Sequence, residues 1–326
     1  MENFAEGLKY IGNLDQLCYA RCDVLEEGSG RGQRVVDVCN GTGLAFTVTP
    51  DRCMNLVECT FNGVPLVFRT PGGHRHCSGD WLRDWAGGLV TTCGLRNAGS
   101  PSGDEGLHGR ISSCPAENLC VKRDANGNIE ISGTMREGAL FSENLHLDRT
   151  IRTAYGDNRI VIDDVVTNWG QEPEYIEILY HCNFGWPFVS PALQFVAPEH
   201  KVEPRDDWAA SALDEWNKLP EPIDGFREMC YRHYLPADEK SGLASMKLVN
   251  QKVGVAVTIS YDVSTLPLIV QWKNCATRGY VLGMEPTCAS LNGREADIAA
   301  GIMPKLACGE SRKFHFEIAF ETSLSR

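Results

Sequence analysis

The segment Lys313-Phe314-His315-Phe316-Glu317-Ile318-Ala319-Phe320-Glu321 alternates apolar and polar residues over most of its length. Successive side chains of an extended strand point to opposite faces, so Phe314, Ile318 and Phe320 share one face and the polar side chains share the other. The pattern predicts a half-buried β-strand. The same period of two recurs from end to end, with glycine-rich turns between the runs, and helical periodicity is rare.

Turn residues place three hairpins in this series of strands. They are Asn62-Gly63 between Leu56–Phe61 and Val64–Phe68, Asn126-Gly127 between Leu119–Lys122 and Ile129–Ser132, and Tyr155-Gly156-Asp157-Asn158 between Leu147–Arg152 and Arg159–Val166. A helical pattern is confined to Asp206–Lys218. No linker, repeat or change of composition divides the chain. We therefore expect an all-β protein, a large antiparallel β-sandwich with one or two short helices, formed as a single domain over residues 1–326.

Composition narrows the classes of partner. The chain has 326 residues and a net charge of −12, without a basic run that could follow a phosphate backbone, so nucleic acid is not an expected partner. No apolar stretch approaches the roughly 18–20 residues that span a bilayer, so no membrane partner is expected either. The first residues, 1–6, resemble no secretion signal. The interpretation is a cytoplasmic protein.

The fourteen cysteines are scattered through hydrophobic runs, and no C-x-x-C pair occurs. Disulfide frameworks are typical of much shorter secreted chains, so reduced and buried thiols are expected. His74-Arg75-His76 has a spacing that could chelate a metal ion, but the sequence offers no obvious third ligand. We therefore expect no metal site.

Three segments place an ionisable side chain in an unusual local setting. In Glu105–Arg110, glycines flank His108, and in Glu177–Trp186 a strongly apolar strand leads to His181 and then to aromatic residues. In Tyr280-Val281-Leu282-Gly283-Met284-Glu285-Pro286, alternation puts Gly283 and Glu285 on one face and apolar side chains on the other. A carboxyl group on such a strand is expected to have a raised pKa. Taken alone, a histidine in a β protein is more often structural than catalytic, and a glutamate at the end of a strand is more often solvated or paired in a salt bridge.

Taken together, these segments resemble the signature stretches of the aldose 1-epimerase (galactose mutarotase-like) superfamily, and they occur in the same order. The matching stretches are Leu107-His108-Gly109, Tyr180-His181-Cys182-Asn183-Phe184-Gly185, Met284-Glu285-Pro286 and Trp81-Leu82-Arg83-Asp84-Trp85-Ala86-Gly87-Gly88-Leu89. The resemblance covers roughly Val35 to Phe320 and is greatest to an uncharacterised branch of aldose 1-epimerase-like proteins. It implies the supersandwich fold of this superfamily.

The resemblance also implies roles for four residues. Glu285 matches the catalytic base, and His181 matches the acid that protonates the ring oxygen. His108 matches the first active-site histidine and Arg83 a substrate-positioning arginine, so both are expected to donate hydrogen bonds to a bound sugar. The implied reaction opens and closes a sugar ring by general acid–base catalysis. It requires neither a metal nor a nicotinamide, so no cofactor is expected.

One departure from the family pattern concerns an aspartate late in the chain that holds sugar hydroxyls. No clear counterpart occurs here, and Glu228 or His233 could substitute for it. Trp272 is a candidate to stack on the sugar, as are Trp85 and Trp186, although large aromatic residues belong more often to the core. Lys273 could meet an anionic substituent if its face of the strand lines the cleft.

The predicted function is therefore that of a carbohydrate-binding isomerase, an aldose 1-epimerase or mutarotase of carbohydrate metabolism that interconverts sugar anomers. Two alternatives stay open. One is a non-catalytic sugar-binding or sensing protein, and the other is an epimerase, isomerase or lyase acting on an acidic or phosphorylated sugar. The expected partner is a small-molecule sugar, and the sequence leaves a homo-oligomer open.

Overall fold

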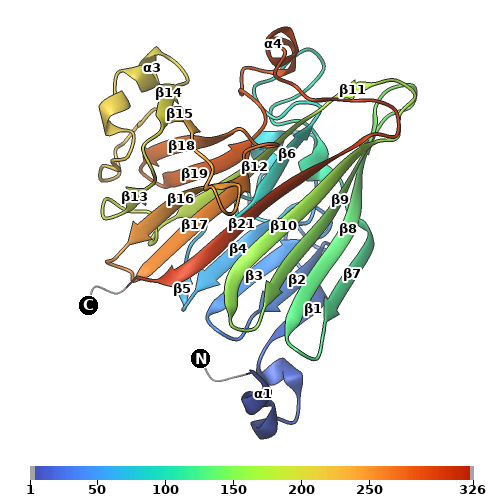
Figure 1. Ribbon diagram of the computed structural model, residues 1–326, viewed down its shortest axis with the longest axis vertical. Helices are drawn as coiled ribbons and strands as arrows, with labels where there is room; N and C mark the ends of the chain where they lie inside the picture. The colour runs from blue at the N-terminus through green and yellow to red at the C-terminus, as the bar shows by residue number, and fades with distance from the viewer. Residues whose placement is uncertain (1–3, 324–326) are drawn as a thin grey trace.

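Antiparallel strands dominate the regular secondary structure of the computed structural model, which describes residues 4–323 (Figure 1). The eight-stranded sheet has the order β13 (Gln194–Val196), β16 (Leu243–Asn250), β17 (Val255–Asp262), β21 (Ser311–Thr322), β10 (Asp157–Asn168), β9 (Asn144–Ala154), β8 (Asn128–Gly138) and β7 (Glu117–Arg123). The six-stranded sheet has the order β14 (Lys201–Pro204), β15 (Met229–Tyr234), β18 (Leu268–Ala276), β19 (Gly279–Thr287), β12 (Glu177–Gly185) and β6 (Thr91–Leu95). The predicted all-β class is confirmed.

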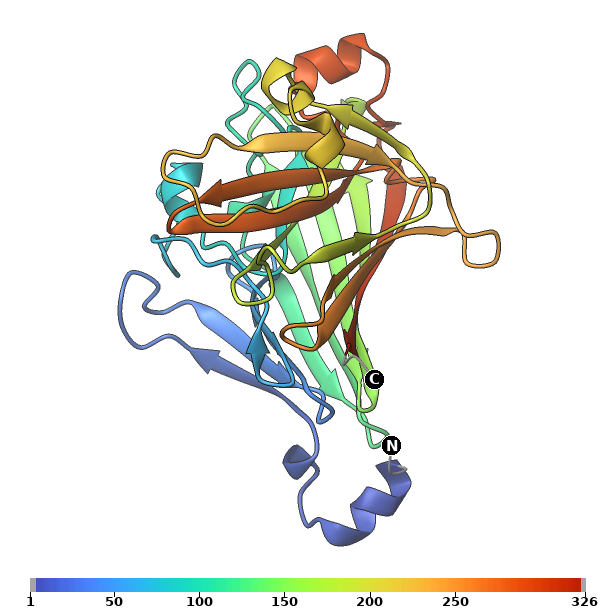
Figure 2. The same ribbon diagram turned by 90° about the vertical axis from the view of Figure 1, so that its left-hand side faces the viewer.

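A third large sheet and a short ribbon contain the other strands formed by residues 4–323. The five-stranded sheet runs in sequence order through β1 (Tyr19–Val24), β2 (Arg34–Cys39), β3 (Leu44–Thr49), β4 (Asn55–Phe61) and β5 (Val64–Pro65). A two-stranded ribbon pairs β11 (Glu174–Tyr175) with β20 (Lys305–Leu306). Figure 2 shows the blue five-stranded sheet beside the long green strands of the eight-stranded sheet.

The three large sheets enclose one apolar core. Its buried members include Val38 and Phe46 from the five-stranded sheet, Ile151 and Phe316 from the eight-stranded sheet, and Cys182 and Met284 from the six-stranded sheet. The eight-stranded sheet is therefore one layer of a sandwich, and the other two sheets share the second layer. Burial of apolar surface between these layers is the main stabilising contribution.

The strand β21 carries the alternation seen in the sequence. Phe314, Phe316, Ile318 and Phe320 are buried in the core, and the residues between them are partly exposed. All three predicted hairpins form, as β4–β5, β7–β8 and β9–β10. The turn residues therefore specified the local pairing correctly.

The helices are short and more numerous than predicted. They are α1 (Phe4–Gly7), α2 (Trp81–Asp84), α3 (Asp207–Ala210), α4 (Arg294–Ala299) and the 3₁₀ turns η1 (Leu8–Tyr10), η2 (Leu14–Gln16), η3 (Ile111–Ser113) and η4 (Leu213–Glu215). The predicted helical segment Asp206–Lys218 contains α3 and η4, and the Asp206 side chain caps α3 by accepting a hydrogen bond from Ala209 N at 2.8 Å. Helices of four to six residues are too short to show a helical period, which explains why the others were missed.

The strand β12 differs from the outer strands because all nine of its residues are buried. One face of β12 contributes Cys182 and Phe184 to the apolar core. Its other face, which carries His181 and Asn183, is buried as well, so chain segments must cover the six-stranded sheet on that side. The candidate site lies beneath this cover.

Candidate active site

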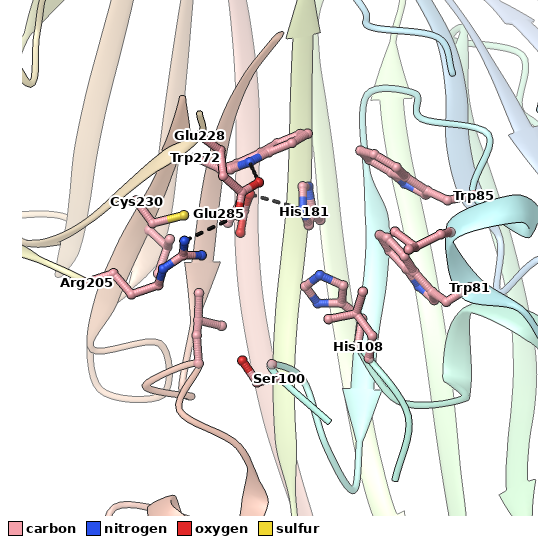
Figure 3. Close-up of a pocket in the computed structure, with 15 residues that line it drawn as sticks. Trp81, Trp85, Ser100, His108, His181, Arg205, Glu228, Cys230, Trp272 and Glu285 are labelled. Carbon is pink, nitrogen blue, oxygen red and sulfur yellow. Dashed lines mark hydrogen bonds and ion pairs between the residues drawn. The ribbon is translucent and has the colours of Figure 1, made fainter. Parts of the chain in front are cut away.

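A cavity that is partly open to solvent lies on the face of the six-stranded sheet that is turned away from the core. It is lined by Trp81, Leu82, Trp85, Gly99, Ser100, Leu107, His108, His181, Arg205, Glu228, Cys230, Val270, Trp272, Glu285 and Leu291. The sheet supplies the floor, and α2 and the loop that carries His108 supply the facing wall (Figure 3). Residues from seven separate stretches of chain therefore meet in one sugar-sized hollow.

Glu285 and His181 lie next to each other on the floor of this cavity. Neighbouring strands β12 and β19 pair at Cys182 and Met284, so the residues flanking this pair lie side by side on the opposite face. Glu285 Oε1 is 3.2 Å from His181 Nε2, and both side chains are almost completely buried. The contact is not aligned as a hydrogen bond, and Glu285 Oε1 has no hydrogen-bond partner among residues 4–323. Both groups can therefore engage a hydroxyl group that enters between them.

Burial determines the charge state of this pair. Burial raises the pKa of Glu285 well above its usual range, the nearby Glu228 adds to that effect, and Arg205 opposes it. Burial also lowers the pKa of His181 well below its usual range, and His108 acts in the same direction. A carboxyl group and an imidazole that both favour their neutral forms hold one transferable proton between them.

His108 reaches the cavity from a loop with a left-handed backbone. His108 itself has φ +59° and Gly109 has φ +67°. A Cβ atom on Gly109 would lie 2.4 Å from the carbonyl oxygen of Gly94, so only glycine allows this close approach. The close approach to Gly94 therefore accounts for the glycine that follows His108 in the sequence. The ring lies 5.4 Å from that of His181, measured between centroids, in an edge-to-face arrangement.

Three tryptophans form the aromatic walls. Trp81 and Trp85 stack with ring centroids 5.0 Å apart, and Trp85 lies 5.8 Å from Trp272. Both Trp85 and Trp272 also contact the ring of His181, at 5.2 and 5.4 Å. Flat aromatic surfaces around a few convergent polar groups suit the apolar C–H face of a sugar ring.

Glu228 and Arg205 form the charged end of the cavity. Glu228 Oε2 accepts a hydrogen bond from Trp272 Nε1 at 2.7 Å, and Glu228 Oε1 is 3.2 Å from Arg205 Nη2. Glu228 was predicted from the sequence, and Arg205 was not. Arg205 directly follows β14, and only the long-range pairing of β14 with β15 brings it beside Glu228.

Five of the eight residues predicted from the sequence line the cavity. They are Glu285, His181, His108, Glu228 and Trp272. Of the other two stacking candidates, Trp85 lines the cavity, whereas Trp186 is exposed and lies outside the lining.

Arg83 is the first of the three predicted residues that do not line the cavity. Its side chain is 76% exposed and pairs with Asp80 at 3.1 Å. Trp81 and Trp85, four residues apart, share the face of α2 that is turned toward the cavity, so Arg83, halfway between them, points away. In this structure the guanidinium group at the cavity is that of Arg205.

His233 and Lys273 lie on the other face of the sheet. Val270 and Trp272 of β18 face the cavity, so Lys273 faces away, and its Nζ donates hydrogen bonds to the carbonyl oxygens of Glu215 and Lys218. His233 is fully buried and is hydrogen-bonded to His200 and Gln271. Alternation along the strands explains both positions.

Residues 4–323 contain no group of three or more His, Cys, Asp or Glu side chains arranged to hold a metal ion. None of the helices formed by these residues is long and apolar enough to cross a bilayer. All fourteen cysteines in this part of the chain are free, and eight of them are buried.

Comparison with solved structures identifies the fold. A candidate aldose 1-epimerase from Klebsiella pneumoniae subsp. pneumoniae superposes with a TM-score of 0.87 at 26% identity, covering 95% of this chain and 86% of that one. A galactose mutarotase-like protein from Clostridium acetobutylicum gives a TM-score of 0.68 at 13% identity, covering 94% and 99%. The galactose 1-epimerase of Lactobacillus acidophilus gives 0.64 at 12% identity, with the same coverage. The predicted galactose mutarotase-like fold is confirmed.

Comparison of sequences gives the family. No curated protein matches the chain. A family model described as a domain of unknown function, DUF4432, matches residues 30–320, close to the range over which the sequence motifs were recognised. Since this match spans most of the chain, the protein belongs to the DUF4432 family and has the galactose mutarotase-like fold.

Proposed function

We propose that this protein is a carbohydrate-binding isomerase, an aldose 1-epimerase that interconverts the anomers of a sugar. The observation that carries the proposal is the 3.2 Å approach of Glu285 Oε1 to His181 Nε2 on the buried floor of a tryptophan-lined cavity. The names of the structurally similar proteins, which include a galactose 1-epimerase, support the same reaction class.

The proposed reaction is a redox-neutral ring opening. A base removes the proton of the C1 hydroxyl group, the C1–O5 bond breaks with its electron pair moving to O5, and an acid delivers a proton to O5. Rotation about C1–C2 and the reverse proton transfers then close the ring from the other face. One acid and one base are required, and a Glu285–His181 pair that holds a single proton supplies both.

The other lining residues are proposed to bind the sugar. Trp81, Trp85 and Trp272 offer the aromatic surfaces, and His108 offers a ring nitrogen to a hydroxyl group. The Arg205–Glu228 pair offers hydrogen-bond donors and acceptors at the charged end of the cavity. We propose that it replaces the aspartate that the family pattern contains and this chain lacks.

The direct test is to add the purified protein to freshly dissolved single anomers and follow mutarotation by polarimetry or NMR exchange. The panel contains neutral aldoses, uronates and sugar phosphates. We expect saturable acceleration, proportional to enzyme concentration, for at least one sugar class. A sugar that raises the melting temperature without any acceleration would identify a non-catalytic binding protein and would refute the enzyme proposal.

Gly283 makes room for the Glu285 carboxyl group, so a larger residue at this position should disturb the site. A Cβ atom at residue 283 would lie 2.3 Å from Glu285 Oε1 and 3.1 Å from the Cβ atom of Trp272. Gly283→Ala is therefore expected to displace the carboxyl group and to lower kcat by on the order of 10²-fold, as a misplacement of about 1 Å can do.

The matched control is Gly279→Ala on the same strand β19. A Cβ atom there meets its nearest neighbour, in Ala276, at an ordinary 3.7 Å. We expect Gly279→Ala to retain the wild-type rate, measured in the same polarimetric assay. Equal rates for the two variants would show that the position of the Glu285 carboxyl group does not limit turnover.

We propose that the chain forms one domain, because a single apolar cluster draws on all three large sheets. We also propose a cytoplasmic location, with which fourteen free thiols are compatible.

A further inference from the structure

Backbone carbonyl groups fix the orientation of the side-chain amide of Asn183. Its Nδ2 donates hydrogen bonds to the carbonyl oxygens of Gly88 at 3.0 Å and of His181 at 2.7 Å. Carbonyl oxygens only accept, so the nitrogen of the amide must be on this side. The Asn183 Oδ1 atom therefore points at the imidazole of His181, with whose Nδ1 it forms a hydrogen bond.

This orientation determines which ring nitrogen of His181 carries hydrogen. Because Asn183 Oδ1 is an acceptor, His181 Nδ1 must be the donor. In a neutral imidazole the other nitrogen then has no proton. His181 Nε2, the nitrogen 3.2 Å from Glu285, therefore presents a lone pair to the cavity.

His108 is fixed in the same way. Its Nδ1 contacts the carbonyl oxygen of Ala98 at 2.8 Å and must donate to it. Burial lowers the pKa of His108, which favours the neutral ring. Its Nε2 is then an acceptor too, and not the donor expected from the sequence.

We infer that the resting site carries its transferable proton on Glu285, so that Glu285 acts as the acid and His181 Nε2 as the base, with Asn183 as the positioning residue that fixes this assignment. The inference rests on the proposed function and deepens it. It reverses the roles that the resemblance implied for Glu285 and His181. Within the described part of the chain no donor is aligned with the buried Glu285 Oε1, and this also favours the protonated acid.

The groups around Glu285 and His181 are consistent with this placement of the proton. The titratable or charged groups facing the pair are His108, Glu228 and Arg205 across the cavity and the thiols of Cys93 and Cys230 beside it, and the thiol of Cys182 lies on the opposite face of β12. Of these, Arg205 carries the positive charge, and its ion pair with Glu228 offsets that charge. Burial shifts the pKa values of Glu285 upward and of His181 downward, which is the direction required.

A pH–rate profile does not distinguish the two assignments. Both contain one proton on the pair, so both predict loss of activity when a second proton binds at low pH and when the last one leaves at high pH. The location of the proton must be observed directly. Two spectroscopic readouts of the free wild-type protein provide this without any substrate.

The first readout is ¹⁵N NMR of histidine-labelled protein at neutral pH, with His181→Gln and His108→Gln used to assign the signals. We expect both rings to carry hydrogen on Nδ1 and a lone pair on Nε2. The second is infrared difference spectroscopy, in which a protonated-carboxyl band should disappear in Glu285→Gln. A protonated Nε2 on His181, or the absence of that carboxyl band, would overturn the inference.

Substitutions of Asn183 test its positioning role. Asn183→Leu removes the acceptor, so a mixture of His181 tautomers is expected, together with a loss of kcat on the order of 10–100-fold. Asn183→Asp keeps an acceptor on Nδ1 and adds a negative charge, so the tautomer should persist while the acidic limb of the pH profile moves to higher pH. An unchanged single tautomer in Asn183→Leu would exclude the role of Asn183.

The outcomes separate this inference from the proposed function. If the NMR and infrared results are as expected but no sugar is turned over, the proton inventory stands and the proposed reaction is wrong. If turnover is found with the proton on His181, the reaction stands and the assignment made here is wrong.

Discussion

Glu285→Gln is expected to slow anomer exchange by about 10²–10⁴-fold, the range that one general acid–base group contributes. The amide has nearly the shape of the carboxyl group and still hydrogen-bonds to a hydroxyl, but it cannot transfer a proton. Binding should therefore survive, because the tryptophans, His108 and the Arg205–Glu228 pair are untouched. Mutarotation followed by NMR exchange measures the rate, and the sugar-induced rise in melting temperature measures binding.

The control for this variant is Glu203→Gln on β14. Glu203 lies outside the cavity lining, where it pairs with Lys201 and accepts a hydrogen bond from Tyr234. Its replacement should leave the rate of mutarotation at the wild-type level. Retention of the wild-type rate by Glu285→Gln would remove Glu285 from the proton transfer under either assignment of acid and base.

Local patterns in the sequence were sufficient to predict the fold class. The alternation in β21 and the Asn-Gly turns depend on neighbouring residues alone, and these predictions were confirmed. The arrangement of the strands into three large sheets depends on distant pairings such as β10 with β21, which no local pattern reveals. The resemblance to a known superfamily supplied that part of the prediction.

Residues of the candidate site were predicted where they belong to a recognisable motif. His108, His181 and Glu285 lie in short distinctive stretches, and the structure brings all three to one cavity. Arg83 was predicted from its place in the stretch that resembles the family motif. The sequence did not reveal that this stretch begins with a helical turn. Two positions along α2, about half a helical turn, separate the cavity-facing Trp81 from the exposed Arg83.

Residues whose position depends on strand parity were harder to predict. The alternation in β18 shows that Trp272 and Lys273 face opposite sides, but it does not say which side is the cleft. Arg205 had no local signal at all, because an Arg-Asp-Asp sequence before a short helix resembles an ordinary capped surface turn. Its place in the cavity comes from the antiparallel pairing of β14 with β15.

A buried ion pair of the eight-stranded sheet holds β12, the strand that contains His181. Arg149 and Asp164 are both completely buried, with Arg149 Nη2 2.6 Å from Asp164 Oδ2 and Arg149 Nε 2.9 Å from Oδ1. Tyr180 OH donates to Asp164 Oδ2 at 2.7 Å, and Arg149 Nη1 donates to the carbonyl oxygen of Cys53 at 3.0 Å. The residue next to His181 thus connects β12 to the eight-stranded sheet.

Asp164→Ala is expected to lower the free energy of unfolding by about 3–5 kcal/mol, because it leaves the guanidinium group of Arg149 buried without its counter-charge. Chemical denaturation at neutral pH measures the change. Asp163→Ala is the matched control, since Asp163 lies on the opposite face of the same strand and pairs with Arg152 in a half-exposed position, where the expected loss is about 0–1 kcal/mol. Replacing Arg149, Asp164 and Tyr180 together by Met, Leu and Phe removes all three polar groups and should recover much of the stability lost in Asp164→Ala. Equal losses in Asp164→Ala and Asp163→Ala would mean that Arg149 finds water or another partner, and that the polar anchor beneath His181 is not a principal source of the stability of this site.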